Sequence, residues 1–139
     1  MILLDTNVLS ELMKPAPSEQ VVNWISSRPA TSLFVTVLTQ AELLYGVELL
    51  AEGRRKTALR NAVDAMFKQD FAERILNFDT AAAVEFADIA AKRDKVGKPI
   101  SQIDAQIAAI ARSRGAKIAT RNVKDFEHCG VEIINPWAN

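Results

Sequence analysis

The chain has little of the chemistry that most redox and zinc sites need. Its 139 residues include one cysteine, Cys129, and one histidine, His128. A single cysteine excludes an internal disulfide, and it excludes a zinc site made of thiolates from this chain alone. His128 has no neighbour in sequence at metal-ligand spacing. We therefore interpret Cys129 as a structural thiol and predict no histidine-based centre.

An excess of charge of either sign is also missing. The 17 lysines and arginines balance the 17 aspartates and glutamates, so the formal net charge is zero. Bulk charge therefore neither favours nor excludes a nucleic-acid partner, and any basic footprint must be local. Hydrophobic residues make up 49% of the chain, which excludes intrinsic disorder as a class.

Long hydrophobic runs are absent, so we expect no membrane-spanning segment. The sequence reaches Asp5 after four residues, which is too short for the apolar region of a signal peptide. We therefore expect a soluble protein of the reducing cytoplasm, with no membrane partner. The length predicts one domain over residues 1–139, able to bury about two-thirds of its unfolded surface.

Short apolar runs alternate with longer segments of helical periodicity. The runs predict strands at Ile2–Leu4, Leu33–Val37, Ile75–Phe78, Lys117–Ala119 and Val131–Ile134. Helices are predicted near Glu19–Ser26, Thr39–Glu52, Arg54–Gln69, Thr80–Lys95 and Ser101–Ser113, with a short helical turn after Asp5. Strands that alternate with helices favour the α/β class, here a mostly parallel sheet of about five strands covered on both faces.

Three acidic residues stand where an ordinary core would not place them. Asp5 follows Ile2–Leu4 directly, Glu42 lies inside VTVLTQAELLYGV, and Asp104 lies inside ISQIDAQIAAIA. In a helix, Asp104 falls within the apolar stripe formed by Ile100, Ile103, Ile107, Ala108 and Ala111. Asp5 and Glu42 each follow a predicted strand, as do Thr120 and Asn122, and sites in parallel sheets form outside the carboxyl ends of the strands.

Two explanations of these acids remain open at this point. Thr39–Glu42 and Ser101–Asp104 both fit the capping-box pattern, in which the acid supports the first turn of a helix. Alternatively, the acids surround a cation, because two carboxylates about 4 Å apart repel by about 4 kcal/mol at an effective dielectric of 20. Oxygen ligands without histidine or cysteine suit Mg²⁺ or Mn²⁺. The two roles are compatible.

Other functions on a similar fold are weaker matches to this sequence. A phosphoacceptor receiver domain needs an acidic pair near the first strand, where only Asp5 stands, with Asp79 as a possible acceptor. A haloacid-dehalogenase-type phosphatase needs a second aspartate where this chain has Asn7. A non-catalytic protein-interaction domain would be free to lose the acids, and none of the three is lost.

The segment Thr39–Glu52 is apolar nearly all round, which predicts that a partner chain covers part of it. Basic residues gather locally around the last two predicted strands. This group is the best candidate for holding a phosphate backbone, and it consists of Arg112, Arg114, Lys117, Arg121 and Lys124. Phe126 and Tyr45 could stack on bases, although core packing is the more ordinary use of both.

Four blocks of this sequence, taken in order, resemble the PIN-domain ribonucleases. They are MILLDTNVLSE, TQAELLYGV, ISQIDAQIAAIARSRGAKIATRNVKDFE and the closing IINPW. The resemblance is greatest to the VapC toxins of bacterial toxin–antitoxin pairs, including their FitB-like branch. It implies a three-layer α/β/α domain and Mg²⁺- or Mn²⁺-dependent endonucleolytic cleavage of RNA.

The resemblance also implies which residues act. The family's acids match Asp5, Glu42 and Asp104, which would hold the metal, and its fourth position matches Asn122. That position is often aspartate, so Asn122 departs from the pattern, and Asp125 could supply the missing charge. Thr6 and Thr120 are expected to hydrogen-bond the carboxylates.

Partners follow from the same resemblance. Members of this group are usually held inert by a small VapB-like antitoxin, whose tail packs on the toxin and can place a basic side chain in the acidic pocket. The Thr39–Glu52 segment and its neighbour Arg54 are the expected receiving surface. Members also commonly form homodimers. The RNA target and the number of metal ions stay open.

Overall fold

Five short strands form one sheet in the order β3-β2-β1-β4-β5, and every neighbouring pair is parallel. The computed structural model describes residues 1–138. The strands are β1 (Ile2–Leu4), β2 (Leu33–Thr36), β3 (Ile75–Leu76), β4 (Lys117–Ala119) and β5 (Ile133–Ile134). The five predicted strands are confirmed, although β2, β3 and β5 are shorter than the apolar runs that contain them.

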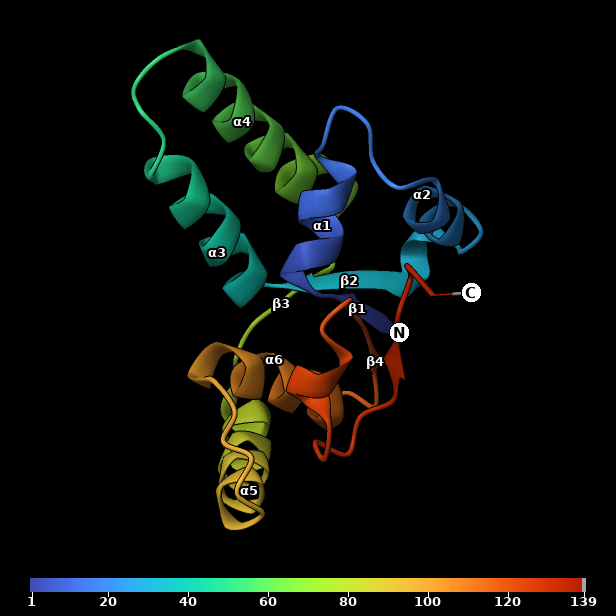
Figure 1. Cartoon of the computed structure of the whole chain (residues 1–139), viewed down its shortest axis with the longest axis vertical. Helices are drawn as coiled ribbons and strands as arrows, with labels where there is room; N and C mark the ends of the chain where they lie inside the picture. Colours follow the sequence, from blue (N-terminus) through green and yellow to red (C-terminus); the bar gives the residue numbers. More distant parts are fainter. Residues whose placement is uncertain (139) are drawn as a thin grey trace.

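Helices cover both faces of the sheet, as Figure 1 shows. One face carries α1 (Thr6–Leu12), α2 (Glu19–Ser26), α3 (Val37–Glu48) and α4 (Arg54–Ala65). The other carries α5 (Thr80–Lys95) and α6 (Gln102–Ser113). The expected three-layer α/β/α arrangement is therefore confirmed. Among residues 1–138, no helix is both long and apolar enough to cross a membrane.

The two layers of helices bury separate cores, one on each face. Leu3 of β1 packs with the α5–α6 cluster, whereas the next residue, Leu4, packs with the cluster under α1 to α4. Successive strand residues point to opposite faces, so both must be apolar when both faces are covered. The run Ile2–Leu4 has no polar alternation for this reason, and Asp5 is the first residue beyond the covered sheet.

Helix starts are set by side chains at the ends of strands and loops. Asp79 caps α5 by accepting the Ala82 N–H at 3.0 Å, and Ser101 caps α6 by accepting the Asp104 N–H at 3.2 Å. The predicted capping box beginning at Thr39 is wrong. Thr36 caps α3 instead, accepting the Thr39 N–H at 3.2 Å, because the helix begins directly where β2 ends.

Other helix predictions need smaller corrections. The predicted helix Arg54–Gln69 ends as an α-helix at Ala65 and continues as a π-helical turn, η2 (Met66–Asp70). Two 3₁₀ turns, η1 (Ala30–Ser32) and η3 (Val123–Phe126), lead into β2 and follow β4. Ile103 was predicted to lie on the buried stripe of α6 but is 38% exposed, and it lines an open hollow with Leu38 and Tyr45 of α3.

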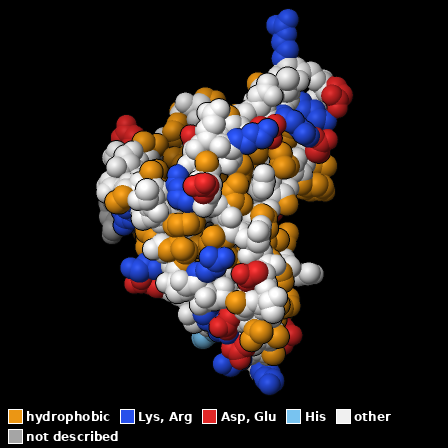
Figure 2. Space-filling view, turned by 180° about the vertical axis from the view of Figure 1, so that it is seen from behind, with side chains coloured by type: hydrophobic (Ala, Val, Ile, Leu, Met, Phe, Trp, Pro, Cys, Tyr) orange, Lys and Arg blue, Asp and Glu red, His pale blue; other side chains and the backbone are white. Residues whose placement is uncertain are grey.

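The α3 helix leaves apolar side chains uncovered in the single chain. Tyr45 is 67% exposed, and Leu49, the residue directly after the helix, is 69% exposed. In Figure 2 hydrophobic side chains gather on the outer side of the α3–α4 hairpin, at the upper right. The prediction that this segment has more apolar surface than the domain can bury agrees with these exposures.

Candidate active site

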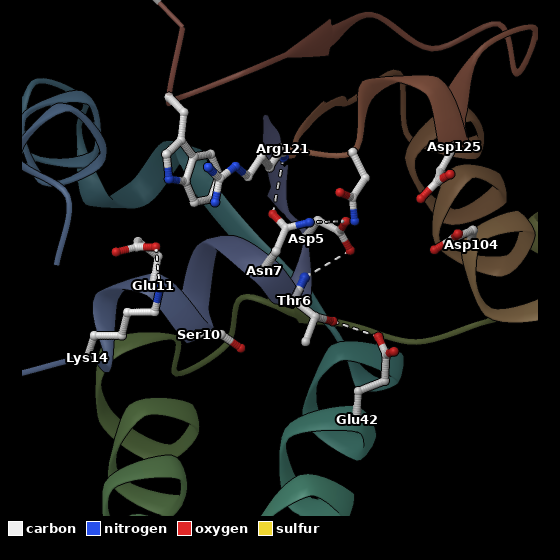
Figure 3. Close-up of a pocket in the computed structure, with 12 residues that line it drawn as sticks. Asp5, Thr6, Asn7, Ser10, Glu11, Lys14, Glu42, Asp104, Arg121 and Asp125 are labelled. Carbon is white, nitrogen blue, oxygen red and sulfur yellow. Dashed lines mark hydrogen bonds and ion pairs between the residues drawn. The ribbon is translucent and has the colours of Figure 1, made fainter.

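The acidic residues singled out in the sequence line one cavity of about 410 Å³ at the carboxyl edge of the sheet. Asp5 follows β1, Glu42 lies on α3 after β2, and Asp104 lies on α6. Asn122 and Asp125, both after β4, line the same cavity. The structure thus brings together every predicted site residue, from segments far apart in the chain (Figure 3).

Asp5 is the most buried of these acids, with 5% of its surface exposed. Its carboxylate accepts the Thr6 N–H at 2.9 Å, the Thr120 hydroxyl at 2.8 Å and the Asn7 amide at 3.2 Å. Burial raises the pKa of Asp5, and the hydrogen bonds from Thr120 and Thr6 oppose that rise. The nearby charges of Glu42 and Asp125 raise this pKa further. The carboxylate is held in place but poorly neutralised.

Thr6 connects the first two acids. Its hydroxyl donates to Glu42 Oε1 at 2.6 Å and lies 3.2 Å from the Thr39 hydroxyl. This bond joins the end of β1 to the first half of α3, so Glu42 faces the cavity and not its own helix terminus. The prediction that Thr6 and Thr120 bind the carboxylates is confirmed for both.

Asp104 lies on the first turn of α6 and is half-buried. Burial raises its pKa from 3.8 to about 6, against the lowering effect of a hydrogen bond with Ser101. The carboxylates of Asp5, Asp125 and Glu42 add to the rise. The capping box predicted here is half right, because Ser101 caps the helix while the Asp104 carboxylate lies in the cavity.

The sequence offered Asn122 or Asp125 for the fourth position of the site, and both residues line the cavity. The Asn122 N–H donates to Thr120 Oγ1 at 3.1 Å, which places Asn122 beside the Asp5 network. Asp125 lies at the other end of η3, and Figure 3 shows its carboxylate next to that of Asp104. Asp125 contributes repulsion to both Asp5 and Asp104. It therefore supplies negative charge that Asn122 lacks.

The donor chemistry of the cavity fits a hard divalent cation. Its lining contains five carboxylates and two cations, which gives a formal net charge of −3. Within residues 1–138, no group of three or more Asp, Glu, His or Cys side chains is arranged as a ready-made metal cage. Mg²⁺ does not require one, because it keeps several waters and is held by one or two carboxylates together with substrate phosphates.

Several residues of the cavity were not predicted from the sequence. Asn7 binds Asp5, Thr120 and the Arg121 N–H, and thereby joins the ends of β1 and β4. Glu11 is buried and accepts the Ser18 N–H at 3.0 Å, which with a bond from Lys14 lowers its pKa. The signal for Asn7 was its place two residues after Asp5, in DTN. A buried acid on a seven-residue helix, such as Glu11, leaves no comparable sign.

Most residues of the predicted basic group are paired with carboxylates within the fold, and the expected core packing of the two aromatic residues is wrong for Tyr45, which is 67% exposed. Arg112 binds Glu85 and Asp88, Arg114 pairs with Asp79, and Lys117 pairs with Glu132. Only Arg121 of the predicted basic group lines the cavity. Phe126 is 1% exposed and belongs to the core. Asp79 caps α5 and lies outside the cavity lining, so the geometry required of a receiver domain is not formed around it.

Comparisons with known proteins find similarity over nearly the whole chain, and not only at these motifs. The PIN domain family model matches residues 2–131. The VapC ribonuclease Y4jK of Sinorhizobium fredii is 39% identical over 137 residues, which cover 99% of this chain and 98% of that relative. Toxin FitB of Neisseria gonorrhoeae is also 39% identical over 137 residues, covering 99% of both proteins. The crystal structure of FitAcB from Neisseria gonorrhoeae is similar with a TM-score of 0.94 and 39% identity, over 100% of both chains.

Proposed function

Since the chain belongs to the PIN-domain family, we propose that it is a divalent-metal-dependent endoribonuclease and the toxin of a toxin–antitoxin pair. The observation that carries this proposal is the single cavity lined by Asp5, Glu42, Asp104 and Asp125. Relatives named as a VapC ribonuclease and as a toxin support it. A fold alone does not define a function, but this fold with these acids in one cavity is specific.

Asp5 and Asp104 are the residues that would hold Mg²⁺ or Mn²⁺, with Glu42 or Asp125 completing the charge. When bound, such an ion lowers the pKa of water and neutralises charge on phosphate oxygens. The raised pKa values of Asp5 and Asp104 support this assignment, because a nearby positive charge would favour their ionised forms.

The chain's own residues have separable tasks in phosphodiester hydrolysis. Thr120 and Asn7 fix the Asp5 carboxylate, so that its orientation does not change as substrate enters. Thr6 holds Glu42 at 2.6 Å, which leaves the second Glu42 oxygen free to accept a proton from, and orient, the attacking water. Asn122 lines the cavity beside this group and could hydrogen-bond a phosphate oxygen through its amide.

Cleavage of RNA by the purified chain tests this function. The chain, freed of any partner, is incubated with total RNA and Mg²⁺, and the cut ends are mapped. We expect cleavage that stops in EDTA and is reduced at least about 100-fold in Asp5→Asn and in Asp104→Asn, because each removes a charge from the ion's site. Asp94→Asn, an exposed acid on α5, is the matched control. Full cleavage by either site variant, in a preparation free of other nucleases, would refute the mechanism.

We further propose that an antitoxin occupies the groove between α1, α3 and α4. This groove has a volume of about 530 Å³ and a largely apolar wall that includes Met13, Leu43 and Leu59. Ser10 and Lys14 line both this groove and the acidic cavity, so one extended partner could reach from the first into the second. Arg54, which the sequence suggested, is not part of this lining, whereas Arg55 is.

A homodimer through α3 is the second proposed assembly. Tyr45 also lines a smaller apolar hollow with Leu38 and Ile103, and this hollow borders Glu42. A partner chain on this face would cover the exposed side chains of Tyr45 and Leu49. Such a dimer would place apolar contacts beside the acidic cavity without filling it.

A further inference from the structure

We propose that Arg121 and Trp137 form a binding subsite for the nucleotide next to the scissile phosphate, with the Arg121 guanidinium as the surface on which a base stacks. This inference rests on the proposed ribonuclease function and deepens it. The ligand is one nucleotide of a single-stranded RNA. The subsite lies in the same cavity as the carboxylates.

The sheet places the two residues side by side. β4 and β5 are neighbouring parallel strands, with Ile118 opposite Ile133 and Ala119 opposite Ile134. The chain therefore leaves both strands at the same edge, and Arg121 and Trp137 are each within three residues of a strand end. The Arg121 guanidinium carbon lies 5.2 Å from the centre of the Trp137 ring. This is a cation–π contact formed across the ends of two strands.

Both residues are held in place by their backbones. The Arg121 N–H donates to Asn7 Oδ1 at 3.2 Å, so Arg121 is attached to the same amide that binds Asp5. The Trp137 N–H donates to Asn135 Oδ1 at 3.0 Å, and the Trp137 ring packs against the core under α1 to α4. The indole is thus a fixed support for the guanidinium end of the arginine.

Arg121 is also the cation of the cavity that, in the described part of the chain, is outside any ion pair, and its charge contributes only the smallest of the causes that lower the pKa of the Glu11 carboxyl. Lys14 pairs with Glu11 at 3.0 Å. Arg121 forms no ion pair within 4.0 Å with a carboxylate of residues 1–138. In Figure 3 its side chain extends away from Asp104 and Asp125, towards the end of the site where Lys14 lies. A cation outside any such ion pair, at the end of the cavity away from Asp104 and Asp125, fits a polyanion whose next phosphate lies beyond the metal-binding half.

The chemistry of a guanidinium plane on an indole favours a nucleotide over a bare anion. A base can stack on the outer face of the guanidinium while the N–H groups at the guanidinium's edge donate to phosphate oxygens. Bases in single-stranded RNA are free to stack in this way. The energy of such stacking corresponds to about 5- to 150-fold in affinity per base.

Steady-state cleavage of a short RNA tests the subsite. The probe is a mixed-sequence, fluorescein-labelled RNA of about 12 nucleotides with Mg²⁺. We expect Arg121→Ala and Trp137→Leu to raise KM about 5- to 150-fold, with kcat within about twofold of the wild type. Arg121→Lys, which keeps the charge but loses the plane, should raise KM by an intermediate factor.

A matched control exists in the same chain. Arg28, two residues after α2 ends, lies 4.0 Å from the ring centre of Trp24 on that helix. Neither residue lines the cavity. Arg28→Ala therefore removes the same kind of contact and the same charge, and we expect its KM to be unchanged. An unchanged KM in Arg121→Ala, with the wild type active, overturns the subsite and leaves the ribonuclease proposal intact. Loss of antitoxin binding by Arg121→Ala, with KM for RNA unchanged, assigns the pair to the protein partner and also overturns it.

Fluorescence separates the two proposals if the wild type does not cleave RNA. The chain contains two tryptophans, so Trp24→Phe leaves Trp137 as the single reporter. We expect the same RNA, without metal, to quench Trp137 emission in this variant, and inorganic phosphate not to do so. Quenching that persists undiminished in Trp24→Phe/Arg121→Ala, or no quenching by RNA at all, counts against the subsite.

Discussion

Asp104 is a residue at which burial and the clustered acids together change a pKa by a large amount. Its carboxyl is half-buried, close to three other acids, and has a pKa raised to about 6. Burial is the main cause of that rise, and the neighbouring carboxylates add to it. A residue in this state has an electrostatic cost in the free chain that a bound cation would remove.

This cost leads to a prediction about stability. The folded chain holds a proton on Asp104 more tightly than the unfolded chain, whose value is near 3.8. Stability linked to this group is therefore lost as pH rises from about 4 to about 6. In metal-free buffer at pH 7 we expect Asp104→Asn to unfold at an equal or higher urea concentration than the wild type, with the difference shrinking toward pH 4.

Urea titrations at both pH values measure this effect, with the exposed Asp94→Asn on α5 as the control. If Asp104→Asn were less stable at pH 7 by about 0.5–2 kcal/mol, the carboxylate would have to be assigned to helix capping. Caps contribute at most about that amount. The Asp104 N–H that Ser101 accepts is unchanged by the substitution.

Elements of secondary structure could be predicted better than their ends. The sequence pattern placed the start of α3 at Thr39, because a glutamate follows three residues later, and it placed Thr36 inside the preceding strand. The structure uses Thr36, because β2 ends there and the chain turns directly into the helix. The capping pattern is local in sequence, whereas this choice depends on the pairing of β2 with its neighbours.

Arg93 is an element-scale feature that no pattern in the sequence indicated. This α5 residue is 5% exposed and donates to the carbonyls of Lys98, Asp125 and Glu127, at 2.5, 2.9 and 2.8 Å. It connects the end of α5 to both sides of η3, the turn that bears Asp125 and follows Asn122. A helix end rich in lysine and arginine is normally exposed to solvent. Arg93 is buried because the segment around η3, distant in sequence, packs against the end of α5.

We predict that Arg93→Ala lowers the free energy of unfolding by about 2–4 kcal/mol, because it leaves buried carbonyls without donors and removes packed side-chain volume. Lys92→Ala, at the exposed neighbouring position, should change it by less than about 0.5 kcal/mol. Chemical denaturation measures both. A loss below about 1 kcal/mol in Arg93→Ala would mean that water replaces the guanidinium at η3.

At the scale of the whole molecule, the strand–helix alternation was sufficient to predict a covered parallel sheet. Asp5, Glu42 and Asp104 were predicted to meet because two of them follow strands and one breaks an apolar stripe. Their partners were harder to predict. Asn7, Glu11 and Trp137 join the cavity through contacts between segments about 100 residues apart or through turns, and pattern periodicity does not report such contacts.

The uncovered face of α3 gives a prediction about assembly. We expect Tyr45→Glu to shift the partner-free chain toward monomer in analytical ultracentrifugation, because it places a charge in the proposed apolar interface. Val84→Glu is the control, since Val84 is 68% exposed on α5, a comparable exposure on the opposite layer. Dissociation by Val84→Glu but not by Tyr45→Glu would place the interface on the other face of the molecule.

The central claim is that the cavity of Asp5, Glu42, Asp104 and Asp125 exists to bind a divalent cation. Calorimetric titration of Mn²⁺ into the metal-free chain tests it most directly. We predict saturable binding by the wild type, weakened at least about tenfold in Asp104→Asn and lost in Asp5→Asn/Asp104→Asn, with Asp94→Asn unchanged. Equal Mn²⁺ affinity in the wild type and the double variant would contradict the account.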